Sequence, residues 1–335
     1  MFYRDMRGKP PAYDRASRMY IVSDPDQCLE LLAMPEISSI PLDLEVEALG
    51  RHFGVEYADI AILASHMPIS QSGERHAAAR RRFSEHLAAR RHAVRAWVEG
   101  PMADSFQPLM QPGRVEVMGE VIVPMFLELM VALIGQPLPP GSRLEWVSLL
   151  FDGLVGLRKR EKMFDQLREL RRYFADVFGT TEDDAAVLLP MVSIVFGREP
   201  LIGTFGESLR RLVRDNPGKR FSEIDYPAGP CETGLPYVER KVTAPIDFHG
   251  VALKPGARLK LMLQSFSGEA ADRHTRFFGG GPHVCPGRPV AIEIWKRSVQ
   301  VLQQSQCRPS VVRYEVNDNN YLFTAPKILE LELTQ

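Results

Sequence analysis

One stretch without internal proline or glycine, Gly73 to Glu99, most limits what this chain can fold into. Its many alanine and arginine residues favour one long helix with a very basic face. Further helices are expected at about 115–135, 142–157, 160–178 and 289–305. Because no internal repeat, low-complexity segment or linker interrupts the pattern, the sequence predicts one domain over residues 1–335, mainly α with a small β part (α+β).

The β part is expected near both ends of the chain. Residues 18–24 predict a short strand, followed by an Asp-Pro turn and a helix from Pro25 to Ala33. Alternating apolar and polar residues over 240–263 indicate β-hairpins, and the C-terminal tail is rich in strand-forming residues. Residues 35–72 contain scattered proline and glycine and are expected to be irregular.

Composition excludes several classes of partner. Of the 335 residues, 41 are basic and 42 are acidic, so a formal net charge of -1 gives no global attraction to nucleic acid or to an anionic membrane. Neither a secretory signal nor an uninterrupted run of about 18 apolar residues is present, which predicts a cytoplasmic protein. The four cysteines are far apart and form no CxxC pair, so neither a disulfide framework nor a zinc site is expected.

A single cysteine lies in a glycine-rich segment, Phe278-Gly-Gly-Gly-Pro-His-Val-Cys-Pro-Gly287. Glycines on both sides of Cys285 let the backbone approach a large flat ligand and direct several N–H groups at one sulfur. A helix is expected just after Gly287, and its positive N-terminal end favours the thiolate form. The alternative is a buried free cysteine in a glycine-rich turn, because a lone cysteine is often only a small apolar residue.

This segment resembles the heme-binding loop of the cytochrome P450 family, Phe-x-x-Gly-x-x-x-Cys-x-Gly followed by alanine. Phe278, Gly281, Cys285, Gly287 and Ala291 match that pattern. The resemblance implies a heme-thiolate fold of the bacterial soluble type, with heme b (iron protoporphyrin IX) as cofactor. It also implies that Cys285 is the axial ligand to iron and that Phe278 shields the thiolate.

The same resemblance implies partners for the two heme propionates, which need cationic or hydrogen-bonding groups when they are buried. The family takes them from a His-x-x-x-Arg pair on an early helix, an arginine opening the first hairpin, and the residue two before the cysteine. His76, Arg80, Arg240 and His283 match these positions. Taken singly, each of them fits a solvated surface residue better, and it is their joint placement that favours contact with the propionates.

The long helix expected over residues 182–214 departs from the family. Oxygen-activating members have a small residue, glycine, an acid and threonine at a kink there, whereas this chain has Phe196-Gly-Arg-Glu-Pro200. Glu199 retains the acid, but proline replaces the hydroxyl residue, and proline is expected to interrupt the helix. Related peroxide-using members place an arginine and a proline here to hold a substrate carboxylate, which implies such a role for Arg198; the alternative is an arginine turned toward neighbouring helices.

Two further departures make the chain a shortened and atypical member. The family's Glu-x-x-Arg is not found about ten residues before Arg240, in a region expected to be loop. Glu207 and Arg210 have the right spacing but lie farther upstream, where an acid and a base three apart are more often a surface ion pair. The stretch from Gln264 to Arg276, between the hairpin and the heme loop, is much shorter than the meander that the family has there.

Three functions remain open on this basis. The leading one is a P450-like monooxygenase that oxidises a small organic substrate in specialised metabolism, with Glu199 supplying protons and a ferredoxin or flavodoxin-type donor supplying electrons. That donor would dock on the basic helix and on Arg288, Lys296 and Arg297. The second is peroxide-driven or redox-independent heme-thiolate chemistry, such as a peroxygenase, isomerase or dehydratase. The third is a heme-binding or partner-binding protein that has lost catalysis.

Overall fold

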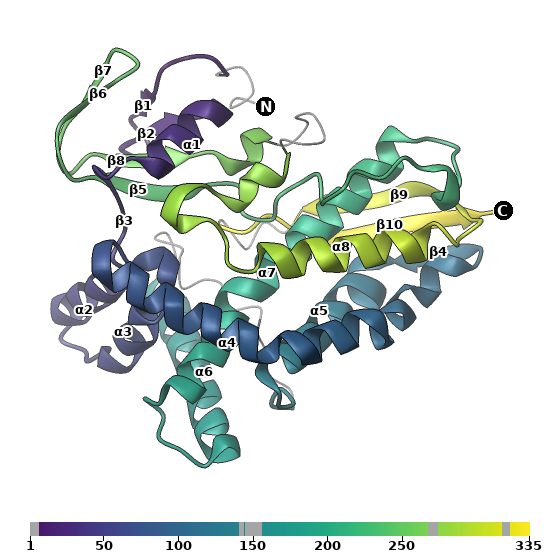
Figure 1. Cartoon of the computed structure of the whole chain (residues 1–335), viewed down its shortest axis with the longest axis horizontal. Helices are drawn as coiled ribbons and strands as arrows, with labels where there is room; N and C mark the ends of the chain where they lie inside the picture. The colour runs from purple at the N-terminus through teal and green to yellow at the C-terminus, as the bar shows by residue number, and fades with distance from the viewer. Residues whose placement is uncertain (1–6, 141–143, 145–155, 267–273, 317–321) are drawn as a thin grey trace.

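The computed structural model describes residues 7–140, 144, 156–266, 274–316 and 322–335 (Figure 1). The helices are α1 (Pro25–Ala33), α2 (Leu42–Phe53), α3 (Ala58–Ser65), α4 (Gly73–Glu99), α5 (Val123–Ile134), α6 (Leu157–Phe178), α7 (Ala185–Asp215) and α8 (Arg288–Leu302). The strands are β1 (Ala12–Asp14), β2 (Met19–Val22), β3 (Ile37–Ser39), β4 (Gly113–Glu116), β5 (Val238–Val242), β6 (Ile246–Phe248), β7 (Val251–Leu253), β8 (Arg258–Leu261), β9 (Arg308–Val316) and β10 (Pro326–Thr334).

The larger sheet brings the two ends of the sequence together. Its strand order is β1-β2-β8-β5-β3, in which β2 and β8 are parallel and the other neighbours are antiparallel. Asp24 caps the N-terminus of helix α1, because its side chain accepts hydrogen bonds from the N–H groups of Asp26 and Gln27. The apolar face of α1 packs on this sheet in a core that includes Leu31 and Leu259, both fully buried.

A second, larger core lies among the helices. Helix α7 contacts α5 and α6, and Phe205 on α7 packs edge to face against Phe126 on α5 with ring centroids 5.0 Å apart. Within the described residues α7 is the one helix long and apolar enough to cross a membrane, but more than half of its most apolar stretch is buried in the protein. A small sheet, β4-β10-β9, packs against this core at the end of the molecule where the C-terminus lies (Figure 1).

Several expected elements are confirmed at nearly their predicted bounds. Helices α1 and α4 coincide with 25–33 and 73–99, and β5 to β8 form the expected hairpin region. The interruption expected in the long helix is wrong, because α7 continues through Pro190 and Pro200. The helix expected at 142–157 falls almost entirely outside the described residues.

The expectation that residues 35–72 are irregular is also wrong. They form β3, α2 and α3, followed by a 3₁₀ turn at Pro68–Ser70. Helix α2 ends at Gly54, whose φ of 66° is the left-handed conformation that glycine adopts without steric cost. The scattered glycine and proline residues therefore punctuate short helices and do not prevent them.

Candidate functional site

The glycine-rich segment forms a tight loop that ends at the N-terminus of α8. Gly279 and Gly281 have φ of 87° and 57°, values that side chains other than glycine rarely adopt. A Cβ on Gly281 would lie 2.8 Å from the carbonyl oxygen of Leu32 in α1, so this glycine permits the loop to pack closely on the helix. The Cys285 N–H donates to the carbonyl of Phe278 at 2.8 Å, which closes the loop.

The thiol of Cys285 has a distinct environment. The other three cysteines are buried, whereas Cys285 retains partial exposure. Burial raises the pKa of this thiol, while the backbone N–H groups of Gly287 and Arg288, which hydrogen-bond the sulfur, lower it. The positive charges of Arg80 and Arg288 also lower it. Burial is the largest of these effects and the pKa of the thiol is raised on balance, so the first turn of α8 and the two arginines offset only part of the cost of burial.

The structure brings together the four residues that match the propionate partners. His76 and Arg80 are on α4, Arg240 is on β5, and His283 lies in the loop before Cys285. The rings of His76 and His283 lie with centroids 4.0 Å apart. Arg80 Nη1 donates to the carbonyl of Val284 at 2.6 Å, which joins α4 to the loop. The described residues thus form one cationic cluster from three distant parts of the chain.

Polar atoms in this cluster lack partners among the described residues. His76 Nε2 and His283 Nδ1 are buried without a hydrogen bond. Arg240 is 4% exposed, and its Nη1 donates to the carbonyl of the neighbouring Glu239 at 2.7 Å. Unpartnered buried donors and an uncompensated buried cation are costly, so the cluster suits an anionic group that accepts hydrogen bonds.

Electrostatics in the cluster agree with this arrangement. Burial lowers the pKa of Arg240 to about 10. Burial lowers the pKa of His283 to about 3, and the charge of Arg240 adds to that effect. The pKa of His76 is lowered by burial and then by the charges of Arg80 and Arg240. Both histidines are therefore neutral at pH 7, and each can donate from one ring nitrogen.

The residues predicted to act in catalysis lie in the middle of α7. Arg198 is 7% exposed and forms an ion pair with its neighbour Glu199, whose side chain is 12% exposed. The Nε of Arg198 is buried and has no partner among the described residues. Helix α4, which bears His76 and Arg80, contacts both α7 and α8. Figure 1 shows α7 passing beneath the loop that leads into α8.

The sequence leaves open whether four apolar residues contact a substrate or belong to the core, and of Trp146, Phe151, Leu154 and Phe164 the structure describes Phe164. Phe164 on α6 is fully buried and packs edge to face on Tyr57, with ring centroids 4.6 Å apart. It therefore belongs to the core. Trp146, Phe151 and Leu154 lie outside the described residues.

The interpretation of Glu207 and Arg210 as a surface pair is wrong. Glu207 is 6% exposed, accepts from Arg210 Nε at 2.7 Å, and accepts from the Tyr314 hydroxyl at 2.6 Å. The Arg210 guanidinium also lies 4.3 Å above the Tyr314 ring. This cluster joins α7 to β9. No signal in the sequence links Tyr314 to the pair, because the contact spans 107 residues.

A second polar contact fastens the loop before β5 to the same helix. The Ser208 hydroxyl accepts from the N–H groups of Cys231 and Glu232, both at 3.0 Å. Arg211 pairs with Glu232 at 2.8 Å. This loop occupies the region in which a Glu-x-x-Arg helix was not found.

Comparison with known proteins finds matches in structure but not in sequence. No protein-family model and no curated protein matches the chain. The structure of P450BioI in complex with acyl carrier protein ligated to hexadec-9Z-enoic acid matches with a TM-score of 0.77 and 16% identity, covering 99% of this chain and 98% of that one. The cytochrome P450 enzyme CYP109B1 of Bacillus subtilis matches with a TM-score of 0.72 and 16% identity, covering 99% and 98%.

A third match has the same character. Cytochrome P450-153 of Novosphingobium aromaticivorans matches with a TM-score of 0.72 and 18% identity, covering 99% of this chain and 95% of that one. Likeness of this extent at such low identity defines the fold. The chain has the cytochrome P450 fold, mainly α with a small β part.

Proposed function

We propose that this chain binds heme b through the Cys285 thiolate and is a P450-like monooxygenase that oxidises a small organic substrate. The observation that supports this most directly is the place of the Cys285 thiol at the N-terminus of α8, beside a cluster of cations and unpartnered polar atoms. Heme held by a cysteine thiolate supplies an electron-rich iron that supports oxygen transfer to organic molecules.

The residues present fit such a cofactor. Two carboxylates would satisfy His76 Nε2, His283 Nδ1 and the buried Arg240 guanidinium, which otherwise lack suitable partners. Glycine at 281 lets the loop lie close to α1, because a Cβ there would lie 2.8 Å from the carbonyl oxygen of Leu32. The sulfur then remains the single soft ligand that the loop offers.

Reduction under carbon monoxide tests the proposal. Purified protein supplied with hemin should bind one equivalent, and the reduced, carbon-monoxide-treated sample should show the strongly red-shifted Soret band of thiolate-ligated heme. Heme binding without that band would contradict ligation by Cys285. Failure to bind hemin at all would contradict the proposed cofactor.

Replacing Arg240 by glutamine should weaken heme binding by about tenfold or more, because its buried guanidinium would lose the charge that pairs with a proposed propionate. The measurement is the rate of heme transfer to apomyoglobin. Arg258→Gln is the matched control: Arg258 lies on the adjacent strand β8, is partly exposed and pairs with Glu239. Equal transfer rates in the two variants would contradict the role assigned to Arg240.

A second candidate is peroxide-driven oxidation of a substrate that bears a carboxylate. Pro200 removes the usual hydroxyl, and the buried Arg198 has an unpartnered Nε that a carboxylate could accept from. The neighbour P450BioI was solved with a fatty acid ligated to acyl carrier protein. Turnover separates the two candidates: product with peroxide alone supports this one, and product only with a ferredoxin system contradicts it.

Replacing Arg198 by leucine should weaken binding of a long-chain fatty acid by about tenfold or more and leave binding of the corresponding alcohol unchanged, because only the carboxylate uses the guanidinium charge. The measurement is the spectral shift of bound heme on titration. Glu199→Gln should have the opposite sign, because it removes the carboxylate that now pairs with Arg198. A parallel loss of acid and alcohol binding in Arg198→Leu would contradict the carboxylate role.

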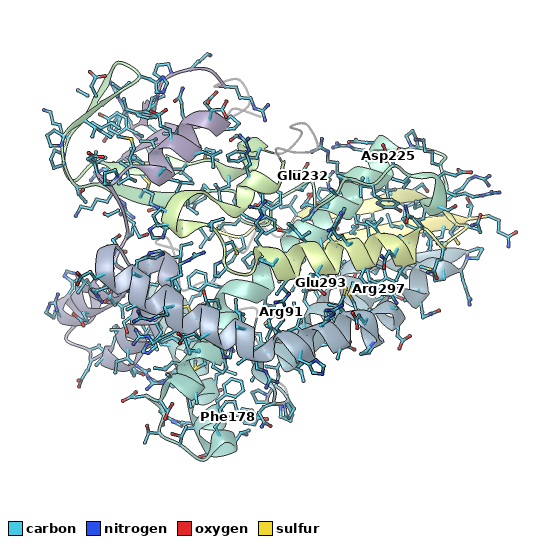
Figure 2. All side chains as sticks on the ribbon, viewed as in Figure 1. Arg91, Phe178, Asp225, Glu232, Glu293 and Arg297 are labelled. Carbon is cyan, nitrogen blue, oxygen red and sulfur yellow. The ribbon has the colours of Figure 1, made fainter. Side chains whose placement is uncertain are left out.

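An electron donor of the ferredoxin or flavodoxin type would dock on the face formed by α4 and α8, which contact one another. Figure 2 shows Arg91 of α4 and Arg297 of α8 on the same side of the molecule, with Glu293 close by. Lys296 is exposed on α8 beside them. Mixed charge on this face predicts a salt-dependent but weak encounter. A heme-bound protein that gives no product with a donor, with peroxide or without either would instead fit the non-catalytic alternative.

A further inference from the structure

Ser39 has a buried hydroxyl that nothing in the described residues satisfies. The residue is 3% exposed, and its Oγ is shielded from solvent and has no hydrogen-bond partner. A serine hydroxyl can donate one hydrogen bond and accept two, so leaving it unpaired inside a protein costs free energy. Such an atom points to a missing acceptor or donor.

The β-sheet fixes the direction of this side chain. Ser39 is the last residue of β3 and lies directly opposite Arg240 on β5 in the antiparallel register. Opposite residues in an antiparallel pair project from the same face of the sheet. Ser39 and Arg240 are both buried, whereas their neighbours Ser38 and Lys241, which are also opposite one another, belong to the other face. Ser39 therefore shares a face with the cationic cluster.

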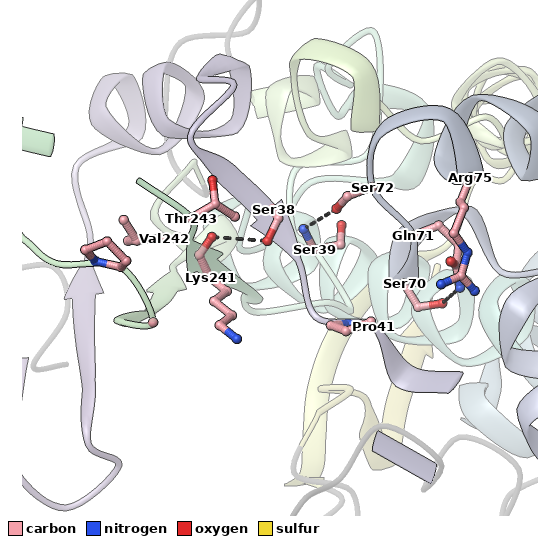
Figure 3. Close-up of a pocket in the computed structure, with 12 residues that line it drawn as sticks. Ser38, Ser39, Pro41, Ser70, Gln71, Ser72, Arg75, Lys241, Val242 and Thr243 are labelled. Atoms are coloured by element: carbon pink, nitrogen blue, oxygen red, sulfur yellow. Dashed lines mark hydrogen bonds between the residues drawn. The ribbon is translucent and has the colours of Figure 1, made fainter. Parts of the chain in front are cut away.

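The backbone of Ser39 is fastened to the helix that bears the rest of the cluster. Its N–H donates to the hydroxyl of Ser72 at 2.9 Å, as Figure 3 shows. Ser72 is the N-cap of α4, one turn before His76, and its side chain does not cap the helix. The hydrogen bond therefore holds the end of β3 beside the start of α4.

The open cavity next to Ser39 does not explain its hydroxyl. The residues that line that cavity, of about 620 Å³, include Ser38, Ser39, Lys241 and Thr243 (Figure 3). The Ser38 and Thr243 hydroxyls already donate to backbone carbonyls. Because the Ser39 Oγ is itself shielded from solvent, water in the cavity does not satisfy it.

We infer that Ser39 donates a hydrogen bond to the heme propionate that Arg240 pairs with, and so is a further cofactor-binding residue. This inference rests on the proposed heme site. Like His76 Nε2 and His283 Nδ1, the Ser39 hydroxyl lacks a partner in the described residues. All three groups lie around Arg240. One carboxylate oxygen can accept from both a guanidinium and a hydroxyl.

The test compares Ser39→Ala with Ser38→Ala, the same change on the neighbouring residue and the opposite face. Ser39→Ala should raise the dissociation constant for heme by about tenfold, and Ser38→Ala should leave it unchanged. Thermal unfolding of the heme-free proteins is the folding control. Ser39→Ala should not lower the midpoint there, because it removes an unpartnered buried hydroxyl.

Heme dimethyl ester, in which both propionates are esterified, provides the decisive comparison. With this cofactor the difference between Ser39→Ala and the unchanged protein should shrink to less than about twofold, because the carboxylate that strengthens the hydrogen bond is gone. Equal heme affinity of Ser39→Ala and Ser38→Ala, or a tenfold loss that persists with the ester, would overturn the inference while leaving the heme site intact. Absence of heme binding in the unchanged protein would instead overturn the proposed function.

Discussion

Replacing Cys285 by serine should abolish the red-shifted Soret band of the reduced, carbon-monoxide-treated protein. A serine hydroxyl stays protonated near neutral pH and is a poor ligand for iron, so the two N–H groups that favour a thiolate at this position no longer have an anion to hold. Heme retained through Arg240 and the two histidines would then absorb at shorter wavelength. The measurement is the reduced carbon-monoxide difference spectrum.

Cys231→Ala provides the control for this experiment. Cys231 is also a free cysteine, but it lies in the helical core, and burial raises the pKa of its thiol to about 11. Its removal should leave the band unchanged. A Cys285→Ser protein that kept the band, or a Cys231→Ala protein that lost it, would show that the ligand had been assigned to the wrong residue.

The loop around Cys285 could be predicted from sequence because its signals are local. Glycine at 279 and 281 and a helix starting after Gly287 are properties of a short segment. The structure confirms the start of α8 at Arg288, and it gives both glycines positive φ angles. The cluster around it is a different case. His76 and His283 are 207 positions apart in the numbering, and only the family resemblance indicated that they meet.

Helix α4 and the region before it show which parts of a fold local pattern can predict. Helix α4 is long, lacks internal breakers and was predicted at both ends. Helices α2 and α3 are short, and helices of that length are stabilised mainly by packing, which a single sequence does not display. Their buried residues, including Val46 and Ile60, belong to the large helical core.

Helix α7 shows how packing overrides a local breaker. Pro200 costs the helix one hydrogen bond. Close contacts on its flank hold the helix regardless, because a Cβ on Gly203 would lie 2.8 Å from the Cα of Gly234, and the Thr204 hydroxyl accepts from the Gly234 N–H at 2.9 Å. The sequence shows the proline but not the loop that packs against it.

The acid and base at Glu207 and Arg210 were visible in the sequence, but their burial was not. Tyr314 lies on a strand that reaches α7 only in the folded protein, and burial, followed by the bond to Glu207, raises the pKa of its hydroxyl. Glu207, Ser208, Arg210 and Arg211 lie on one turn of α7. Through their side chains this turn binds both β9 and the loop before β5. This turn therefore joins to the helical core both β9 and the loop that leads to β5, the strand that bears Arg240.

Replacing Glu207 by alanine should lower the free energy of unfolding by about 2–4 kcal/mol, because it leaves Arg210 and the Tyr314 hydroxyl without their acceptor in a largely buried setting. Urea denaturation followed by far-ultraviolet circular dichroism measures the change. Glu99→Ala is the matched control: Glu99 also pairs with an arginine on a helix, but both side chains are 62% exposed, so no measurable change is expected. If the two variants were equally stable, the Glu207 cluster would contribute no more to stability than an exposed pair, which would contradict this prediction.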